Sequence, residues 1–425
     1  MPARVVVLGG GVGGTLTANL LDRSLGRDVQ VMVVDPTGMH DYQPGYLYVA
    51  LGQASGHWLS RDERTLLRKG VDLAIERAVR IHPDAQTVQL ERGGSLEWDY
   101  LVIATGARLV PEAIPGLVQG AHGFYSLNDA ERLREALRTF KGGRVRVGVA
   151  GIPYKCPPAP VEFTFMVDEY LRKRGIRGRS EVTLLSPLNR AFTIESASKL
   201  IQPILDARGI ELATFFKVET VDPMAGVVES LEGEKVEYDL LVLVPPHKGQ
   251  QVVIDSSLSD SSGWLPTDRF TLQVGDHERI FALGDATNLP ISKSGSTAHF
   301  EAPVIASRIA SLVNGSAPKR NYGGRVLCFL ETGDGKATTL RTTSTHLCHR
   351  SRTGHGTWRN GSSTGRTGRR SREAVCPNGR LERCPRGRRR NHDEPDDRDD
   401  AGPSRARLSA PDREDRGGDP RTCIG

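Results

Sequence analysis

The chain has 425 residues, enough for two or three domains with sizeable hydrophobic cores. Residues 1–340 carry 37 Lys and Arg against 39 Asp and Glu, whereas residues 341–425 carry 20 Arg, no Lys and 12 acidic residues. The formal net charge of +6 therefore arises in the last part of the chain, and it gives no support to nucleic-acid binding by the rest. No run of eighteen apolar residues occurs, which excludes a helix that spans a membrane.

The beginning of the chain has the pattern of a dinucleotide-binding unit. Residues 4–23 (RVVVLGGGVGGTLTANLLDR) predict a buried strand, a tight turn and an amphipathic helix, and residues 29–35 (VQVMVVD) predict a second strand. The pattern's key residues are Gly9, Gly11 and Gly14 in the turn, spaced GxGxxG, and Asp35 at the end of the second strand. Such glycines permit the sharp turn, the approach of a pyrophosphate and close helix packing, and such an acid accepts hydrogen bonds from a ribose.

Two later segments narrow the choice of nucleotide. Residues 100–111 (YLVIATGARLVP) place a buried strand before Thr105 and Gly106. Residues 279–290 (RIFALGDATNLP) place another before Gly284 and Asp285. Each alone is compatible with an ordinary strand-to-turn junction, but all three segments in this order resemble the disulfide reductase-like flavoproteins with two dinucleotide-binding domains. The resemblance implies FAD, with Asp285 on its ribityl chain and the Thr105 turn beside it.

The same resemblance implies an α/β fold with two Rossmann-like domains. The FAD-binding domain is expected to be discontinuous, with a first part at 1–113 and a second part at 268–340. Residues 114–267 are expected to form the second Rossmann-like domain.

The second domain departs from the pattern that binds NADH. Its turn, residues 148–160 (GVAGIPYKCPPAP), keeps Gly148 and Gly151 but has prolines around the third glycine position. Proline lacks the backbone N–H that a pyrophosphate needs. The next strand, residues 181–187 (EVTLLSP), ends without a carboxylate for a ribose. We therefore expect no productive NADH binding.

The turn instead contains Cys156, where the nicotinamide half of NADH would approach a flavin. Cys328 is the other cysteine of residues 1–340. A cysteine pair that faces a flavin can pass it two electrons after a sulfur nucleophile opens the disulfide. The alternative for Cys328 is a small buried residue in an apolar strand. No packing requirement accounts for a Lys-Cys-Pro-Pro sequence at the end of a strand.

Three segments resemble sulfide:quinone oxidoreductases and the related flavoprotein of flavocytochrome c sulfide dehydrogenase. They are residues 151–162 (GIPYKCPPAPVE), 281–309 (FALGDATNLPISKSGSTAHFEAPVIASRI) and 326–340 (VLCFLETGDGKATTL). The resemblance implies that Cys156 and Cys328 form a redox pair bridged by a disulfide or short polysulfide. It implies that Glu162 is an acid or base near the sulfur, with a first-turn carboxylate stabilised by the helix dipole as the alternative. It also implies that Lys293 and Lys336 lie near the flavin or quinone, although each alone is compatible with a solvated surface lysine.

In the reaction implied by this resemblance, hydrosulfide opens the cysteine bridge and the freed thiolate, assigned to Cys156, delivers two electrons to FAD for uptake by a quinone. Two features depart from many relatives. Residues 120–133 lack a third cysteine, and residues 188–196 lack a histidine. His122, His247 and His299 are the remaining loop candidates. The substrate is therefore left open between sulfide, another small sulfur nucleophile and a thiol.

Two other functions remain as alternatives: a type II NADH:quinone reductase-like flavoenzyme, and a non-catalytic or inactive truncated flavoprotein. No basic and apolar leader precedes the first strand, so we expect a cytoplasmic protein. With an intact C-terminal anchor it is expected to lie peripherally on the inner face of the cell membrane, and homo-oligomers are compatible with the sequence.

Residues 341–425 do not have the composition of a folded domain. Five residues there are aliphatic: Leu347, Val375, Leu381, Leu408 and Ile424. We predict a disordered tail, because so little apolar surface cannot offset the entropy of ordering. An RNA-binding arm and a zinc module, the latter without CxxC or HxxxH spacing, are the weaker alternatives. The Arg-rich and Lys-free composition of this segment favours a frameshift near residue 340. Such a frameshift would remove the amphipathic membrane anchor found in similar proteins.

Overall fold

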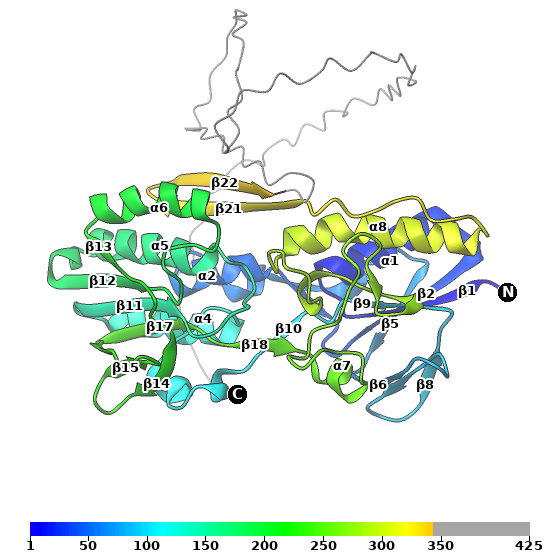
Figure 1. Cartoon of the computed structure of the whole chain (residues 1–425), viewed down its shortest axis with the longest axis horizontal. Helices are drawn as coiled ribbons and strands as arrows, with labels where there is room; N and C mark the ends of the chain where they lie inside the picture. Colours follow the sequence, from blue (N-terminus) through cyan, green and yellow to red (C-terminus); the bar gives the residue numbers. More distant parts are fainter. Residues whose placement is uncertain (343–425) are drawn as a thin grey trace, which may run out of the picture. The chain divides into compact units, whose positions relative to one another are not determined.

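The computed structural model describes residues 1–342. All of them belong to one compact unit (Figure 1). The tail predicted for 341–425 lies outside the described residues, except for Arg341 and Thr342.

The first sheet contains six strands in the order β19-β20-β9-β1-β2-β5. Its strands are β1 (Ala3–Leu8), β2 (Val29–Asp35), β5 (Val71–Ile75), β9 (Tyr100–Ile103), β19 (Gln273–Val274) and β20 (His277–Ala282). Strand β1 is parallel to β2 and β9, with Val5 opposite Val31 and Tyr100. Helices α1 (Val12–Leu25) and α8 (Gly295–Val313) cover one face (Figure 1). Because both faces are covered, the central strands are almost continuously apolar.

The second sheet is entirely parallel, in the order β13-β12-β11-β17. Its strands are β11 (Gly143–Val149), β12 (Ser180–Leu185), β13 (Ile210–Ala213) and β17 (Leu240–Val244). The helices around it are α4 (Leu127–Thr139), α5 (Ala159–Lys173) and α6 (Glu195–Ala207). One sheet that is parallel except for its edge strand β19 and one entirely parallel sheet, both flanked by helices, confirm the expected α/β class with a Rossmann-like arrangement.

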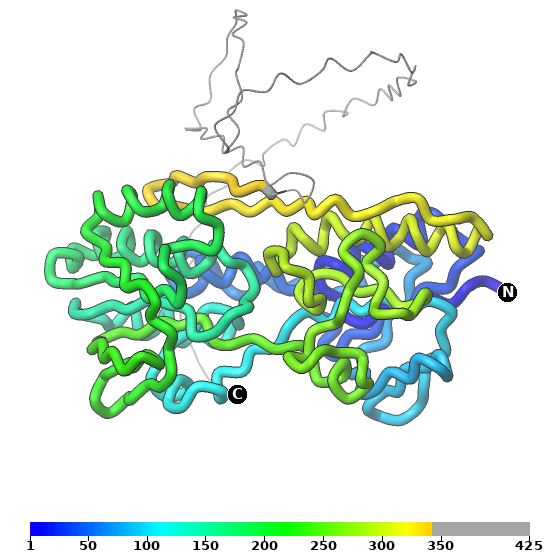
Figure 2. Tube along the Cα trace, in the orientation of Figure 1, coloured from blue at the N-terminus to red at the C-terminus, as the bar shows by residue number. Residues whose placement is uncertain are grey.

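Smaller sheets complete each half. They are β6 (Ala78–His82), β7 (Thr87–Leu90) and β8 (Ser95–Glu97); β14 (Val218–Asp222), β15 (Val227–Ser230) and β16 (Lys235–Glu237); and β3 (Met39–Asp41) with β4 (Ser60–Asp62). The short helices are α2 (Tyr46–Ala50), α3 (Leu117–Gly120) and α7 (Gln251–Asp255). Strands β10 (Ala107–Leu109) and β18 (His247–Gly249) pair antiparallel where the chain passes between the two large sheets (Figure 2).

The final described element is a hairpin of β21 (Val326–Gly333) and β22 (Lys336–Thr342). Its strand β21 packs against α5 of the second half and α8 of the first (Figure 1). On this topology we propose the division expected from the sequence, in which 1–113 and 268–340 enclose the domain at 114–267.

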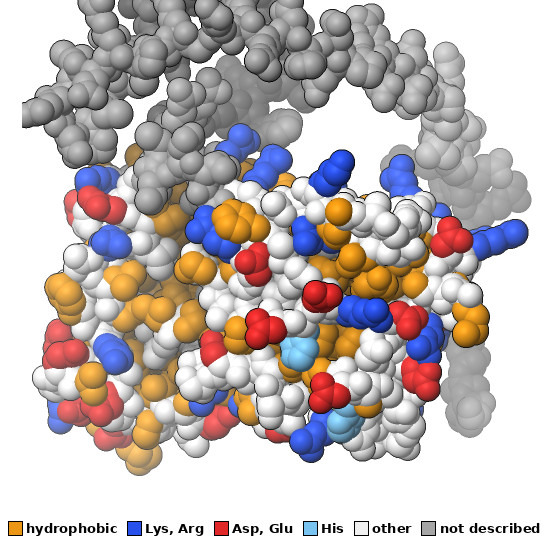
Figure 3. Space-filling model, turned by 45° about the vertical axis from the view of Figure 1, so that its right-hand side comes forward, with side chains coloured by type: hydrophobic (Ala, Val, Ile, Leu, Met, Phe, Trp, Pro, Cys, Tyr) orange, Lys and Arg blue, Asp and Glu red, His pale blue; other side chains and the backbone are white. Residues whose placement is uncertain are grey.

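Charge is mixed on the face seen in Figure 3, where Lys and Arg side chains are interspersed with Asp and Glu. Among residues 1–342, no helix combines the length and apolar character that a membrane span requires.

A buried ionic cluster anchors the hairpin to α5. The Asp168 carboxylate is 1% exposed and accepts hydrogen bonds from Arg172 at 3.0 Å and Arg177 at 2.6 Å. Arg172 and Arg208 also pair with Asp334 in the hairpin turn, at 3.3 and 3.0 Å. The position of β21 therefore depends on charges carried by α5 and α6's C-terminal end.

We expect Asp168→Ala to lower the free energy of unfolding by about 3 kcal/mol, because guanidinium groups would lose a buried counter-charge. Denaturant unfolding measures this loss. The control is Glu135→Ala, which breaks the exposed pair between Glu135 and Arg138 and should leave the free energy of unfolding nearly unchanged. Equal losses in the two variants would show that the cluster does not anchor the hairpin.

Candidate active site

Cys156 lies in the turn between β11 and α5 in a left-handed conformation, with φ +51°. This backbone region is strained for a residue other than glycine, so neighbouring contacts must hold it. The Cys156 N–H donates to the Lys293 carbonyl at 2.6 Å, and its own carbonyl accepts from the Ala159 N–H at 2.9 Å. The Tyr125 hydroxyl donates to the adjacent Lys155 carbonyl at 2.9 Å. The chain is thus fixed with the cysteine against the segment around Lys293.

Cys328 reaches the same segment from β21. Its Sγ lies 3.9 Å from the Ser292 hydroxyl and 4.0 Å from the Ser294 hydroxyl. The structure therefore brings the two cysteines, which are 172 positions apart along the chain, to residues 292–294. Both are free thiols here. The expectation that Cys328 belongs to an apolar strand is also correct, since Val326 and Leu330 of β21 are buried.

The two thiols share a poorly solvated environment. Burial raises the pKa of Cys156 far above its ordinary value, and the nearby charges of Glu162 and Cys328 raise it further. Burial also raises the pKa of Cys328, which the neighbouring serine hydroxyls partly oppose. Both side chains are therefore protonated at neutral pH, and their chemistry requires a proton acceptor close by.

Glu162 lies close enough to both thiols to raise their pKa values. It belongs to the first turn of α5, as one alternative for this residue requires, but it is only 8% exposed. Its Oε1 accepts the Glu331 backbone N–H at 2.9 Å. Burial raises the pKa of Glu162 to about 7. A helix dipole would lower this pKa, so burial is the larger effect. At neutral pH this carboxyl group exists in both protonation states.

The first glycine turn has the geometry of a nucleotide cradle. Gly9 has φ +105°, and a Cβ there would lie 2.5 Å from the Ala104 carbonyl oxygen. A Cβ on Gly14 would overlap the Gly9 carbonyl oxygen, whereas a Cβ on Gly11 would have no atom within 4 Å. Positions 9 and 14 therefore require glycine, because a Cβ there would clash with backbone atoms. At position 11 the structure instead leaves open space at the N-terminus of α1, as pyrophosphate binding requires.

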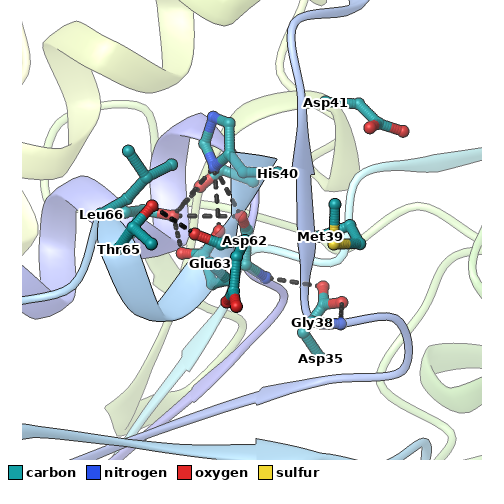
Figure 4. Close-up of polar contacts among 12 residues, drawn as sticks. Asp35, Gly38, Met39, His40, Asp41, Asp62, Glu63, Thr65 and Leu66 are labelled. Carbon is teal, nitrogen blue, oxygen red and sulfur yellow. Dashed lines mark hydrogen bonds and ion pairs between the residues drawn. The ribbon is translucent and has the colours of Figure 1, made fainter. Parts of the chain in front are cut away.

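Asp35 ends β2 beside this turn. Its Oδ2 accepts the Gly10 N–H at 2.9 Å, and its Oδ1 accepts the Thr37 and Gly38 N–H groups at 2.9 and 3.0 Å (Figure 4). The carboxylate therefore orders both the glycine turn and the bend after β2.

A buried cluster that the sequence analysis missed lies under the same turn. His40 Nδ1 is 2.9 Å from the Gly10 carbonyl oxygen and 3.1 Å from Glu63 Oε2 (Figure 4). The Thr15 hydroxyl donates to Glu63 Oε1 at 2.5 Å. The Glu63 hydrogen bond raises the pKa of His40, although burial opposes it. No sequence motif connects these residues, which meet only because β3 and β4 fold back on α1.

Buried polar atoms near these turns that have no partner among the described residues include Thr105 Oγ1, Asp285 Oδ1, His247 Nε2 and Glu301 Oε1. Thr105 and Gly106 follow β9, and Gly284 and Asp285 follow β20. Buried polar atoms are rarely left unpaired in proteins. Together with the open space at Gly11, these atoms fit a polar ligand such as FAD.

Two expectations about histidines are wrong. His247 is not in a loop but in strand β18, where Nδ1 donates to the Pro245 carbonyl at 2.8 Å. Burial, together with Lys155, lowers the pKa of His247 to about 4, so the ring is neutral. His299 is exposed on helix α8 rather than in a loop. His122 does lie between elements, half-buried.

The two lysines have different surroundings. Lys293 is 6% exposed, and its ammonium donates to the Asp285 and Thr287 carbonyls at 2.9 and 2.5 Å and lies 3.8 Å from the Trp264 ring centroid. Burial lowers the pKa of Lys293 to about 8. Lys336 is exposed at the start of β22, near the hairpin turn, and the structure does not bring it to the cysteines. The interpretation of Lys293 as a solvated surface lysine is therefore wrong.

Mostly apolar side chains, among them those of Tyr154, Pro160 and Phe192, line the crevice beyond β11 and β12 where a second Rossmann unit would hold NADH. The loss of the glycine pattern thus coincides with apolar side chains in the nucleotide's place.

Comparison with known proteins agrees with this geometry. A family model described as pyridine nucleotide-disulphide oxidoreductase matches residues 3–302. The chain is 29% identical over 340 residues to the mitochondrial sulfide:quinone oxidoreductase of Mus musculus, a match covering 77% of this chain and 75% of that protein. It is 26% identical over 355 residues to the sulfide-quinone reductase of Aquifex aeolicus, covering 79% and 82%.

The solved structure of the sulfide:quinone oxidoreductase from Aquifex aeolicus superposes with a TM-score of 0.72 at 22% identity, covering 80% of this chain and 87% of that one. This likeness shows the fold, and the family match spans most of residues 1–342. The chain therefore belongs to the pyridine nucleotide-disulphide oxidoreductase family.

Proposed function

We propose that the chain is an FAD-dependent oxidoreductase that oxidises sulfide through Cys156 and Cys328 and passes the electrons to a quinone. The similarity to sulfide:quinone oxidoreductases supports the reaction. The observation that supports the site is the convergence of both thiols on residues 292–294, beside Asp285.

The residues that would hold the cofactor lie in the turns that follow strands of the first sheet. Gly9, Gly11 and Gly14 would face the pyrophosphate, with Asp35 toward the adenosine ribose. Thr105 and Asp285 would use their unpaired oxygens on the flavin half, with Gly106 and Gly284 providing the turns. FAD, when bound, supplies a two-electron acceptor that a quinone can reoxidise.

The cysteines and Glu162 would perform the sulfur chemistry. Hydrosulfide attacks the oxidised bridge, breaking one S–S bond and forming another, so that one cysteine becomes a persulfide and the other a thiolate. Glu162 accepts the persulfide proton. The persulfide anion of one cysteine and the thiolate of the other then form a new S–S bond. The resulting bridge is one sulfur atom longer, and its formation releases two electrons. Each hydrosulfide thus yields one bridging sulfur atom, one proton and one electron pair.

The buried ammonium of Lys293 would stabilise negative charge on the reduced cofactor or quinol. For Lys336 the same role remains a prediction made from the sequence alone. Docking on the inner face of the cell membrane and homo-oligomer formation are likewise proposals, as is the loss of the membrane anchor from this chain.

Titration of the purified holoprotein separates this function from NADH oxidation. Without oxygen, we expect sulfide to bleach the flavin absorbance and a soluble quinone to restore it. NADH at the same concentration should leave the flavin oxidised, because the turn after β11 has prolines around its third glycine position and lacks backbone N–H groups for a pyrophosphate. Rapid bleaching by NADH, with none by sulfide, would instead identify an NADH:quinone reductase.

A further inference from the structure

The carboxylate beside the thiols is linked to a second carboxylate that no sequence motif singles out. The Glu331 backbone N–H donates to Glu162 Oε1 at 2.9 Å, and the Glu331 side chain accepts a hydrogen bond from the Tyr48 hydroxyl. These residues come from three elements, α5, β21 and α2. Glu331 follows Cys328 by three positions on the same strand, so this connection joins both cysteine-bearing segments.

We propose that the Glu331 carboxylate, held in place by Tyr48, tunes the proton transfer that Glu162 performs at the cysteine pair. This inference rests on the proposed function of Glu162, and it makes Glu331 and Tyr48 positioning residues rather than catalytic ones.

The electrostatics of the group support the proposal. After burial, the negative charge of Glu331 is what raises the pKa of Glu162, while the Glu331 N–H opposes the rise. The other titratable groups that interact with Glu162 are Cys156 from the turn, Cys328 from β21, Tyr48 from α2 and Tyr125. Burial raises the pKa of both tyrosines, so they stay neutral and Tyr48 remains a donor to Glu331. Burial is thus the main cause of the raised pKa of Glu162, and Glu331 is the charged neighbour that raises this pKa further.

The same helix offers an internal comparison. Glu169, two turns further along α5, also accepts a backbone N–H from the hairpin, that of Asp334 at 2.8 Å. There, burial raises the pKa but the ion pair with Lys173 and the Asp334 N–H outweigh it, so the pKa of Glu169 is lowered. One contact type thus occurs twice, and in both places the carboxylate of the donating residue raises the pKa of the accepting one. The difference is Lys173, which places a cation beside Glu169, whereas no cation is among the causes that shift the pKa of Glu162.

Infrared spectroscopy of the holoprotein tests the proposal without sulfide. The band of the protonated Glu162 carboxyl group is assigned by its loss in Glu162→Gln and followed against pH. In Glu331→Gln, we expect the midpoint of this band to fall by roughly one pH unit, because the opposing charge is gone while the backbone N–H bond remains. Tyr48→Phe should shift it in the same direction but less. Glu169→Gln, the matched control, should leave it unchanged.

Sulfide-dependent flavin reduction supplies the second measurement. The limb of its pH profile that disappears in Glu162→Gln should move to lower pH in Glu331→Gln. An unchanged infrared midpoint in Glu331→Gln, or an equal shift in Glu169→Gln, would overturn the inference. If the midpoint shifts but sulfide reduces no flavin in the wild-type protein, the coupling is real and the proposed sulfide oxidation is wrong.

Discussion

Replacing Cys156 by serine should slow the reduction of bound FAD by sulfide at least about a thousandfold, because an oxygen cannot form the bridge that sulfide opens. The fold around the position should survive. Its hydrogen bonds to Lys293 and Ala159 use the backbone, and serine has nearly the same shape as cysteine. Anaerobic stopped-flow mixing, which follows the flavin absorbance, measures the rate.

Two further variants make the result specific. Cys328→Ser should cause a loss of the same size, because both sulfur atoms belong to one bridge. Cys348→Ser removes a cysteine to which the proposal gives no role, so it should keep the wild-type rate. Unchanged FAD content and melting temperature exclude unfolding as the cause. Reduction of Cys156→Ser at the wild-type rate would refute the cysteine mechanism.

The parts of the site that were predictable from sequence are those with a recognisable local sequence pattern. Gly14 is required by a contact inside the turn, with the Gly9 carbonyl oxygen, and Gly9 by its positive φ and the nearby Ala104 carbonyl oxygen. Both positions follow from the GxGxxG spacing after a strand. Cys156 was noticeable for the opposite reason. It stands where the glycine pattern of a nucleotide-binding turn is interrupted by prolines, and the structure places mostly apolar side chains in the crevice beyond that turn.

Contacts between distant segments could not be predicted in this way. His40 and Glu63 meet under the glycine turn because a short hairpin folds onto α1, and neither carries a recognisable motif. Glu331 gains its importance from a backbone bond to Glu162, which depends on how β21 packs against α5. Lys336 is exposed at the start of β22, and its place near the flavin or quinone stays a prediction made from the resemblance.

The second large effect is expected at Gly11. We expect Gly11→Val to weaken FAD binding at least about a hundredfold, because the new side chain would fill the open space where a pyrophosphate approaches the N-terminus of α1. The backbone tolerates valine, since Gly11 has φ −82° and ψ −174°. Fluorescence titration of the apoprotein with FAD measures the dissociation constant, and thermal unfolding of the apoprotein should be nearly unchanged.

Gly178→Val is the matched control, because a Cβ there also meets no atom within 4 Å but the residue follows α5 in the second half of the fold. It should bind FAD like the wild type. Gly14→Ala gives a different failure, since its Cβ would overlap the Gly9 carbonyl oxygen and disturb the turn even without cofactor. If Gly11→Val loses FAD but keeps the stability of the apoprotein, position 11 is part of the binding surface. If Gly14→Ala loses both FAD and stability, position 14 is a packing contact. Tight FAD binding by Gly11→Val would mean that this turn is not the cofactor's cradle.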